Sequence, residues 1–197
     1  KFGDALALAR IPEAKLCVRA AFLLAILTQE TGLNGVIGGN LGRCFYNTSW
    51  STPSGTIMSK TQAPAFLSIM QQIGRDPATT PVSCPINRDG TYGGAMGPAQ
   101  FMPTTWVIYK PRVESLLNIA QASPFDNLSA FSGSAIYLSD GLQNCKAVYG
   151  TQYDQERCAA AKYYAGGNWR KHMSGYGKSV ASRAVQFQKD IDILDAQ

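Results

Sequence analysis

Apolar residues recur at helical spacing along most of the chain, so helices are the expected secondary structure. Most of these segments begin or end at a residue that commonly starts or stops a helix. Glycine, proline, asparagine, serine and threonine gather between the segments and predict loops at 38–59, 76–94 and 166–177. At most, the first two loops form a small antiparallel strand pair. The helical segments after the N-terminal one are 63–73, 103–109, 126–141, 155–164 and 180–194.

The strongest helical pattern runs from residue 11 to residue 30. Leu23, Ile26 and Leu27 share one face with Glu30, because these positions are spaced i, i+3, i+4 and i+7. Pro12 suits a first helical position, where its missing N–H costs nothing. Gly32 follows the last turn, where glycine most easily forms a left-handed cap. We therefore expect one helix over this range.

Glu30 is a carboxylate on the stripe that faces the core. Loss of hydration disfavours the charged form, so its pKa is expected to rise. A carboxyl that stays protonated near neutral pH can serve as a general acid. The alternative is a solvated helix end, which is where most glutamates in such positions lie.

A second informative segment runs from Gly93 to Pro103. It contains three glycines, two prolines and one polar side chain, Gln100, which precedes Phe101 and Met102. Glycine lets backbone approach a ligand closely, and proline stiffens turns. A plain structural turn would not need an amide beside two large apolar residues.

This segment, G-A-M-G-P-A-Q-F-M-P-T-T-W, resembles the second motif of the lysozyme-like lytic transglycosylases, which cut the glycan strands of peptidoglycan. Its Q-F-M-P run is nearest to the membrane-bound type B members. Gln29-Glu30-Thr31-Gly32 is similar to the motif around the family's catalytic glutamate, with threonine in place of the usual serine. The run 160–167 resembles the third motif, with Tyr164 where asparagine is common. The three motifs occur in the family's order.

The resemblance covers most of the chain and implies a mainly α, lysozyme-like fold with long cleft-forming loops. We expect a single domain over residues 1–197, with its core at about 12–187. In the family, one glutamate protonates the bond between N-acetylmuramic acid and N-acetylglucosamine. It then acts as base while the 6-hydroxyl attacks and closes a 1,6-anhydro ring. The resemblance implies that Glu30 has this role. Because no water enters the reaction, no second carboxylate is expected to activate one.

Other positions acquire expected roles around that glutamate. By resemblance, Tyr163 hydrogen-bonds Glu30, and Gln100 and the backbone around Met96 contact the sugar. Trp169 is the tryptophan best placed to stack on a sugar ring. The further substrate-binding candidates are Phe101, for which packing beneath the cleft is the alternative, Tyr164, and Asn40, for which a turn is the alternative.

Two other functions remain open. A hydrolytic muramidase of goose-lysozyme type would position water with a second acid, for which Asp89 is the nearest candidate in sequence. In its Asn-Arg-Asp-Gly context, Asp89 also suits a plain turn. A catalytically silent glycan-binding module is the other alternative, and the presence of Glu30 argues against it.

Composition excludes several further classes. The single histidine, His172, argues against a catalytic zinc site and against a Cys–His peptidase. No phosphate-binding glycine loop occurs in the sequence. We therefore expect no metal and no cofactor. The net charge of +5 favours an anionic partner such as the cell wall. The basic residues form no stripe interleaved with aromatics, so nucleic acid is not an expected partner. No apolar run is long enough to cross a bilayer, and a monomer is expected.

Five cysteines suggest an oxidising compartment, and thus a secreted or cell-envelope protein. Cys145 and Cys158 would close a short loop worth roughly 3 kcal/mol, and Cys44 would pair with Cys84. Cys17 would be left, buried on the first helix. Sequence alone does not fix this pairing. Because the chain does not begin with methionine, it is expected to be a mature or excised piece of a longer precursor.

Overall fold

The computed structural model describes residues 2–32, 42–85 and 92–196. The chain forms two compact units, one of residues 1–37 with 134–197 and one of residues 38–133. The expectation of a single domain over residues 1–197 stays a prediction. Glu30 belongs to the first unit and Gln100 to the second, so each is described within its own unit.

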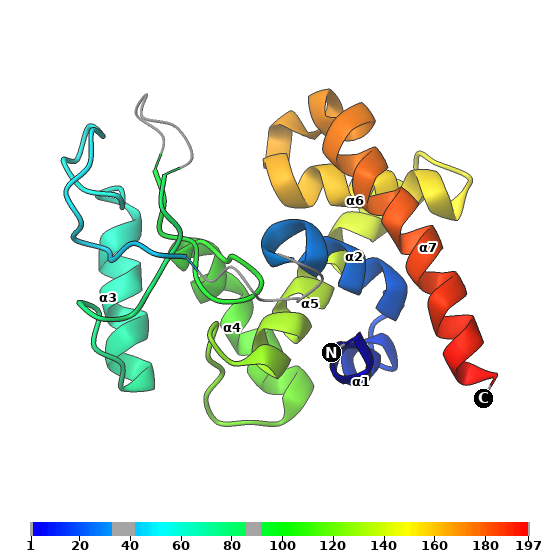
Figure 1. Ribbon diagram of the computed structural model, residues 1–197, viewed down its shortest axis with the longest axis horizontal. Coiled ribbons are helices and arrows are strands. Elements are labelled where there is room, and N and C mark those ends of the chain that lie inside the picture. Colours follow the sequence, from blue (N-terminus) through cyan, green and yellow to red (C-terminus); the bar gives the residue numbers. More distant parts are fainter. Residues whose placement is uncertain (1, 33–41, 86–91, 197) are drawn as a thin grey trace. The chain divides into compact units, whose positions relative to one another are not determined.

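The first unit is built around a buried helix. Helix α2 (Ala20–Thr31) has no solvent-exposed side in its first two turns, because every residue from 20 to 27 is buried. It packs against α1 (Phe2–Glu13) and lies alongside α7 (Lys178–Asp195) (Figure 1). Helix α7 in turn contacts α6 (Gln152–Ala165). A helix that is apolar all round must be covered by other elements, and α1 and α7 supply part of that cover.

The expectation of one helix over residues 11–30 is wrong. Pro12 lies in the last turn of α1, and the chain turns between residues 14 and 19 before α2 begins. Arg19 is extended, with φ −60° and ψ 139°, because its side chain is held by residues distant in sequence. Periodicity carries no information about such contacts. Gly32 is also not left-handed: its φ is −75°, and a Cβ there would lie 2.4 Å from the Thr28 carbonyl oxygen.

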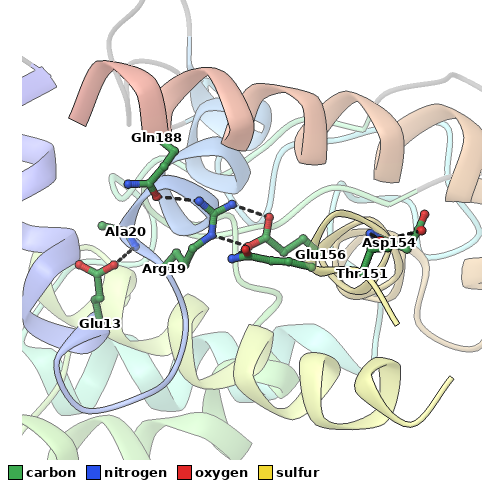
Figure 2. A network of polar contacts seen from close by, with 8 residues as sticks. Glu13, Arg19, Ala20, Thr151, Asp154, Glu156 and Gln188 are labelled. Atoms are coloured by element: carbon green, nitrogen blue, oxygen red, sulfur yellow. Dashed lines mark hydrogen bonds and ion pairs between the residues drawn. The ribbon is translucent and has the colours of Figure 1, made fainter. Parts of the chain in front are cut away.

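A polar network fixes the point where α2 starts (Figure 2). The Arg19 guanidinium donates from Nε and Nη2 to the two carboxylate oxygens of Glu156, each at 2.8 Å, and from Nη1 to Gln188 Oε1 at 2.6 Å. Glu156 is only 2% exposed. The carboxylate of Glu13 accepts the backbone N–H of Ala20 at 2.7 Å, which satisfies a free donor at the start of the helix. The network ties α1, α2, α6 and α7 together.

The second unit contains α3 (Gln62–Ile73) and α4 (Pro103–Leu117), which pack on each other. Helix α5 (Asn127–Lys146) begins in this unit and ends in the first. Three expected boundaries are confirmed. Gly74 caps α3 with φ 67°, Pro103 is the first residue of α4, and the Asp126 carboxylate accepts the Ser129 N–H at 2.8 Å at the start of α5.

The structure is mainly α, as expected. In residues 2–32, 42–85 and 92–196, β pairing is limited to three isolated antiparallel bridges. The expected loop at 166–177 is instead helical, a 3₁₀ helix η1 (Gly166–His172) followed by a π-helix η2 (Met173–Gly177). Gly166, with φ 51°, ends α6 without stopping the helical turns that follow. The buried face of α7 ends before Leu194, which is 45% exposed. No described helix is both long and apolar enough to cross a membrane.

Both expected disulfides are present. Cys44 is bonded to Cys84 and Cys145 to Cys158. Cys17 is free, as expected, but it is exposed rather than buried. The reason is the break between α1 and α2, which places Cys17 in the turn instead of on the apolar face of a helix.

Candidate active site

Glu30 lies in the last turn of α2, one residue before its end. Its neighbour Gln29 is held from α7, where Arg183 Nη1 donates to Gln29 Oε1 at 2.9 Å and the Ser179 hydroxyl donates to the same oxygen at 3.3 Å. The Thr31 hydroxyl donates to the Leu27 carbonyl at 3.1 Å. These contacts fix the backbone on both sides of Glu30, so the carboxyl is presented from a rigid element.

The Tyr176 hydroxyl, from η2, donates a hydrogen bond to Glu30 Oε1. Burial raises the pKa of the Glu30 carboxyl, and the Tyr176 hydrogen bond opposes part of that rise. Because Oε1 accepts from Tyr176, the acidic proton of a neutral Glu30 resides on Oε2. No described residue hydrogen-bonds Oε2. Glu30 can therefore donate a proton from Oε2 while Tyr176 holds the other oxygen.

Tyr163, on α6, lies near the same carboxyl. Its hydroxyl forms a 3.1 Å hydrogen bond with the Ser134 hydroxyl, and its ring packs on Tyr137 with centroids 5.1 Å apart. Burial, and after it the charge of Glu30, raises the pKa of Tyr163 well above its ordinary value. Tyr163 therefore stays protonated at neutral pH. Its predicted hydrogen bond to Glu30 stays a prediction.

Tyr164 supports the tyrosine that binds Glu30. Its ring stacks on Tyr176, with centroids 4.5 Å apart and planes inclined by 18°, and meets His172 edge-on at 5.0 Å. Tyr164 is 53% exposed, so one side of this stack is open to solvent. Tyr164 thus braces Tyr176.

Tyr176 itself was missed by the sequence interpretation. It lies 146 residues from Glu30, in a Gly-Tyr-Gly run that suggests only a turn. The usable signal was that it follows the third motif within one loop length, where a side chain can fold back toward α6. The π-helical turn of η2, which contacts both α6 and α7, positions it.

For the glycan cleavage that the sequence predicts, we expect Tyr176→Phe to lower the rate about tenfold, because it removes a hydrogen bond to a charged or ionisable group. That hydrogen bond lowers the Glu30 pKa, so its loss should also shift the alkaline limb of the pH–rate profile to higher pH. The measurement is kcat/KM between pH 4 and 9. Tyr153→Phe, which removes the 3.1 Å contact with Ser182, is the control. A lower rate with an unmoved alkaline limb would exclude the Tyr176 contact from setting the state of Glu30.

In the second unit, residues 96–101 form a tight turn. Met96 and Phe101 exchange two backbone hydrogen bonds, at 2.9 and 3.1 Å, and the Gln100 N–H donates to the Gly97 carbonyl at 3.1 Å. Gly97 has φ 63°, and a Cβ there would lie 1.9 Å from the Pro124 carbonyl oxygen. Glycine is thus required at this position by both conformation and space.

Gln100 is one of two non-glycine residues in the described chain with positive φ, at 54°. This conformation is unfavourable for a side chain other than asparagine or aspartate. Its Nε2 donates to the Gly97 carbonyl at 2.9 Å, and no described residue donates to its Oε1. The amide is therefore fixed in place with a free acceptor, which is the arrangement that a sugar hydroxyl or N-acetyl N–H would need.

The other predicted residues of this segment are buried. Met96 is fully buried, and Phe101 packs on Trp106 and Tyr109 with ring centroids 5.4 and 6.5 Å away. The packing of Phe101 agrees with the alternative given for it. A role in substrate binding stays a prediction for both residues.

Gln100 has a left-handed backbone conformation that glycine adopts without strain. We expect Gln100→Gly to leave the free energy of unfolding within about 1 kcal/mol of wild type. Relief of about 1–2 kcal/mol of left-handed strain is offset by the lost side-chain hydrogen bond and the greater entropy of glycine. The glycan cleavage that the sequence predicts should fall at least about tenfold, because the Oε1 acceptor is gone. Urea unfolding and release of soluble fragments measure the two effects. A destabilised protein of unchanged specific activity would make Gln100 a purely structural residue.

The remaining candidates fall in different places. Trp169, on η1, is partly exposed, and Lys162 Nζ and Arg170 Cζ lie 5.2 and 4.6 Å from the centre of its ring. Asn40 and Asp89 lie outside the described residues. Among the residues that are described, no group of three or more histidine, cysteine, aspartate or glutamate side chains could hold a metal ion.

Solved structures of lytic transglycosylases share this fold. The Escherichia coli lytic transglycosylase Slt35 in complex with bulgecin A aligns with a TM-score of 0.55 and 16% identity, over 93% of this chain and 71% of that one. The soluble lytic transglycosylase SltB1 from Pseudomonas aeruginosa aligns with a TM-score of 0.55 and 16% identity, over 99% and 76%. No protein-family model and no curated protein matches the sequence. The chain thus has the mainly α, lysozyme-like fold of these proteins.

Proposed function

We propose that this protein is a peptidoglycan lytic transglycosylase with Glu30 as its single general acid and base. The observation that carries the proposal is the state of Glu30, a carboxyl with a raised pKa whose Oε1 accepts from Tyr176 and whose Oε2 accepts no hydrogen bond from the described residues. The fold shared with lytic transglycosylases and the three motifs support the same assignment.

In the first step, Glu30 Oε2 gives its proton to the glycosidic oxygen between N-acetylmuramic acid and N-acetylglucosamine, and the bond to C1 breaks. The charge that then develops on Glu30 is stabilised by the Tyr176 hydroxyl, which stays protonated because burial raises the pKa of Tyr176. Glu30 next removes the proton of the muramic acid 6-hydroxyl as this oxygen attacks C1. A 1,6-anhydro ring closes, and the carboxyl regains its proton.

By the motif resemblance, Gln100 would bind sugar through its Oε1, to which no described residue donates, and Trp169 would stack on a sugar face. Peptidoglycan lies outside the cytoplasm, where the two disulfides would persist. We therefore propose a secreted or cell-envelope location and a monomeric enzyme that needs no metal or cofactor.

The test is release of soluble fragments from purified, insoluble peptidoglycan. Wild type should release fragments in proportion to time and enzyme concentration, and Glu30→Gln should release none. A glycan-binding module would bind the same material without solubilising it. Binding without release by the wild type would therefore replace the enzymatic proposal with the silent module.

A hydrolytic muramidase is the second candidate. It requires an acid that activates water, and Asp89 remains the candidate from the sequence. Asp89→Asn should leave a transglycosylase active, whereas a hydrolase that depends on this residue would lose most of its rate.

A further inference from the structure

The positive charge of this protein is concentrated in one segment. Residues 157–189 contain seven of the 18 lysines and arginines and none of the 13 acidic residues. The segment therefore carries a formal charge of +7, and the remainder of the chain carries −2. It comprises most of α6, all of η1 and η2, and the first two-thirds of α7.

Two of these cations converge on one aromatic ring. Lys162 Nζ, from α6, lies 5.2 Å from the centre of the Trp169 ring, and Arg170 Cζ, from η1, lies 4.6 Å from it. Neither Lys162 nor Arg170 forms an ion pair with a carboxylate among the described residues. In the same part of the chain, Arg157 is paired with Asp154 at 3.4 Å. The Lys162–Trp169–Arg170 cluster thus carries two positive charges that the described protein does not neutralise.

The cluster adjoins the residues around Glu30. Lys162 immediately precedes Tyr163 and Tyr164 on α6, and η1 leads directly into η2, which carries Tyr176. Both η1 and η2 pack on α6. The cluster and Tyr176, the tyrosine that binds Glu30, thus lie on α6 or on elements that pack on it.

We propose that the Lys162–Trp169–Arg170 cluster binds the carboxylates of the stem peptide, so that the preferred substrate is peptide-bearing glycan and not bare glycan. This inference rests on the proposed function, because the stem peptide is attached to the muramic acid whose bond Glu30 would cleave. Stem peptides carry free carboxylates on a short tether from that sugar. Arginine and lysine beside an aromatic face offer charge-assisted hydrogen bonds to carboxylates and apolar contact to the peptide.

The test measures binding in the Glu30→Gln background, so that it does not depend on catalysis. Three preparations of insoluble wall are compared: intact, stripped of stem peptides by an amidase, and stripped of phosphate-containing polymers. Binding to intact and to phosphate-free wall should be about tenfold tighter than binding to peptide-free wall. Adding Lys162→Gln and Arg170→Gln should abolish this preference. The matched control, Arg43→Gln with Lys146→Gln, removes the same charges elsewhere and should retain it.

Thermal unfolding of each variant establishes that it is folded, and added salt should weaken binding to intact wall. Equal binding to intact and peptide-free wall would overturn the proposal. So would loss of binding on removal of phosphate, or a preference that survives in the Lys162→Gln, Arg170→Gln variant. Cleavage by wild type is a separate readout: peptide-dependent binding without cleavage would refute the proposed function alone, and cleavage without peptide preference would refute this inference alone.

Discussion

Glu30→Gln is expected to lower glycan cleavage by about a thousandfold or more. The variant keeps the size and one hydrogen-bond acceptor of the side chain, but it has no proton to give and no base to form. The measurement is the initial rate of fragment release under saturating substrate. Tyr153→Phe, which removes an exposed contact with Ser182 and leaves the carboxyl in place, is the control. A Glu30→Gln protein with more than a tenth of the wild-type rate would refute the assignment of Glu30.

The same substitution should raise stability at neutral pH. Burial raises the pKa of Glu30 above its ordinary value of 4.5, so the folded protein holds this proton more tightly than the unfolded chain does. Stability is therefore unaffected by Glu30 below the unfolded pKa and falls as pH rises from there through the folded pKa. Glu30→Gln removes this loss of folding stability, because glutamine does not ionise. Its melting temperature should match wild type near pH 4 and exceed it at pH 7, and the opposite order would show that the carboxylate form is favoured.

Arg19→Met is expected to cost about 3–5 kcal/mol of folding free energy. Among the described residues, it leaves the carboxylate of Glu156, which is 2% exposed, with only Gln152 Nε2 at 3.4 Å as a partner. It also releases the extended residue at which α2 begins. The midpoint of urea unfolding measures the loss, and a melting temperature lower by about 10 °C is the corresponding thermal effect.

Arg10→Met is the matched control. Arg10 pairs with Asp195 at 2.6 Å, but both side chains are about half exposed, at 43% and 54%. Solvent screens such a pair, so its loss should lower the free energy of unfolding far less than the loss of Arg19 does. The double variant Arg19→Met, Glu156→Leu should recover most of the stability lost in Arg19→Met, because no buried charge remains. Equal losses at Arg19 and Arg10 would show that the Glu156 network does not fix the start of α2.

The sequence predicted most helices because their boundaries are local. Gly74, Pro103 and Asp126 act on the turn beside them, and all three lie where a helix begins or ends. The break before α2 was not predictable in this way. It depends on Arg19 contacting Glu156, 137 residues later, while the local sequence favours a continuous helix. The loop expected at 166–177 failed for a related reason, since glycines there permit 3₁₀ and π turns that packing on α6 selects.

In the candidate site, too, residues with a local signal were predictable, and residues placed by distant contacts were not. Glu30 was predictable because an apolar stripe and a motif coincide on it, and the structure agrees on the direction of its pKa shift. Tyr176 was not, because a tyrosine between two glycines has no local feature that points to a carboxyl on another helix. Tyr164 was predicted to contact substrate, and its stacking on Tyr176 became visible only in the structure.

The mass of the soluble products tests the central claim most directly. Purified peptidoglycan is digested with wild type, and the fragments are compared with those of a hydrolytic muramidase. A single acid and base acting without water predicts fragments that end in 1,6-anhydromuramic acid, each one water lighter than a reducing end. Fragments with reducing ends would contradict the mechanism and make the protein a hydrolase with a second acid yet to be identified.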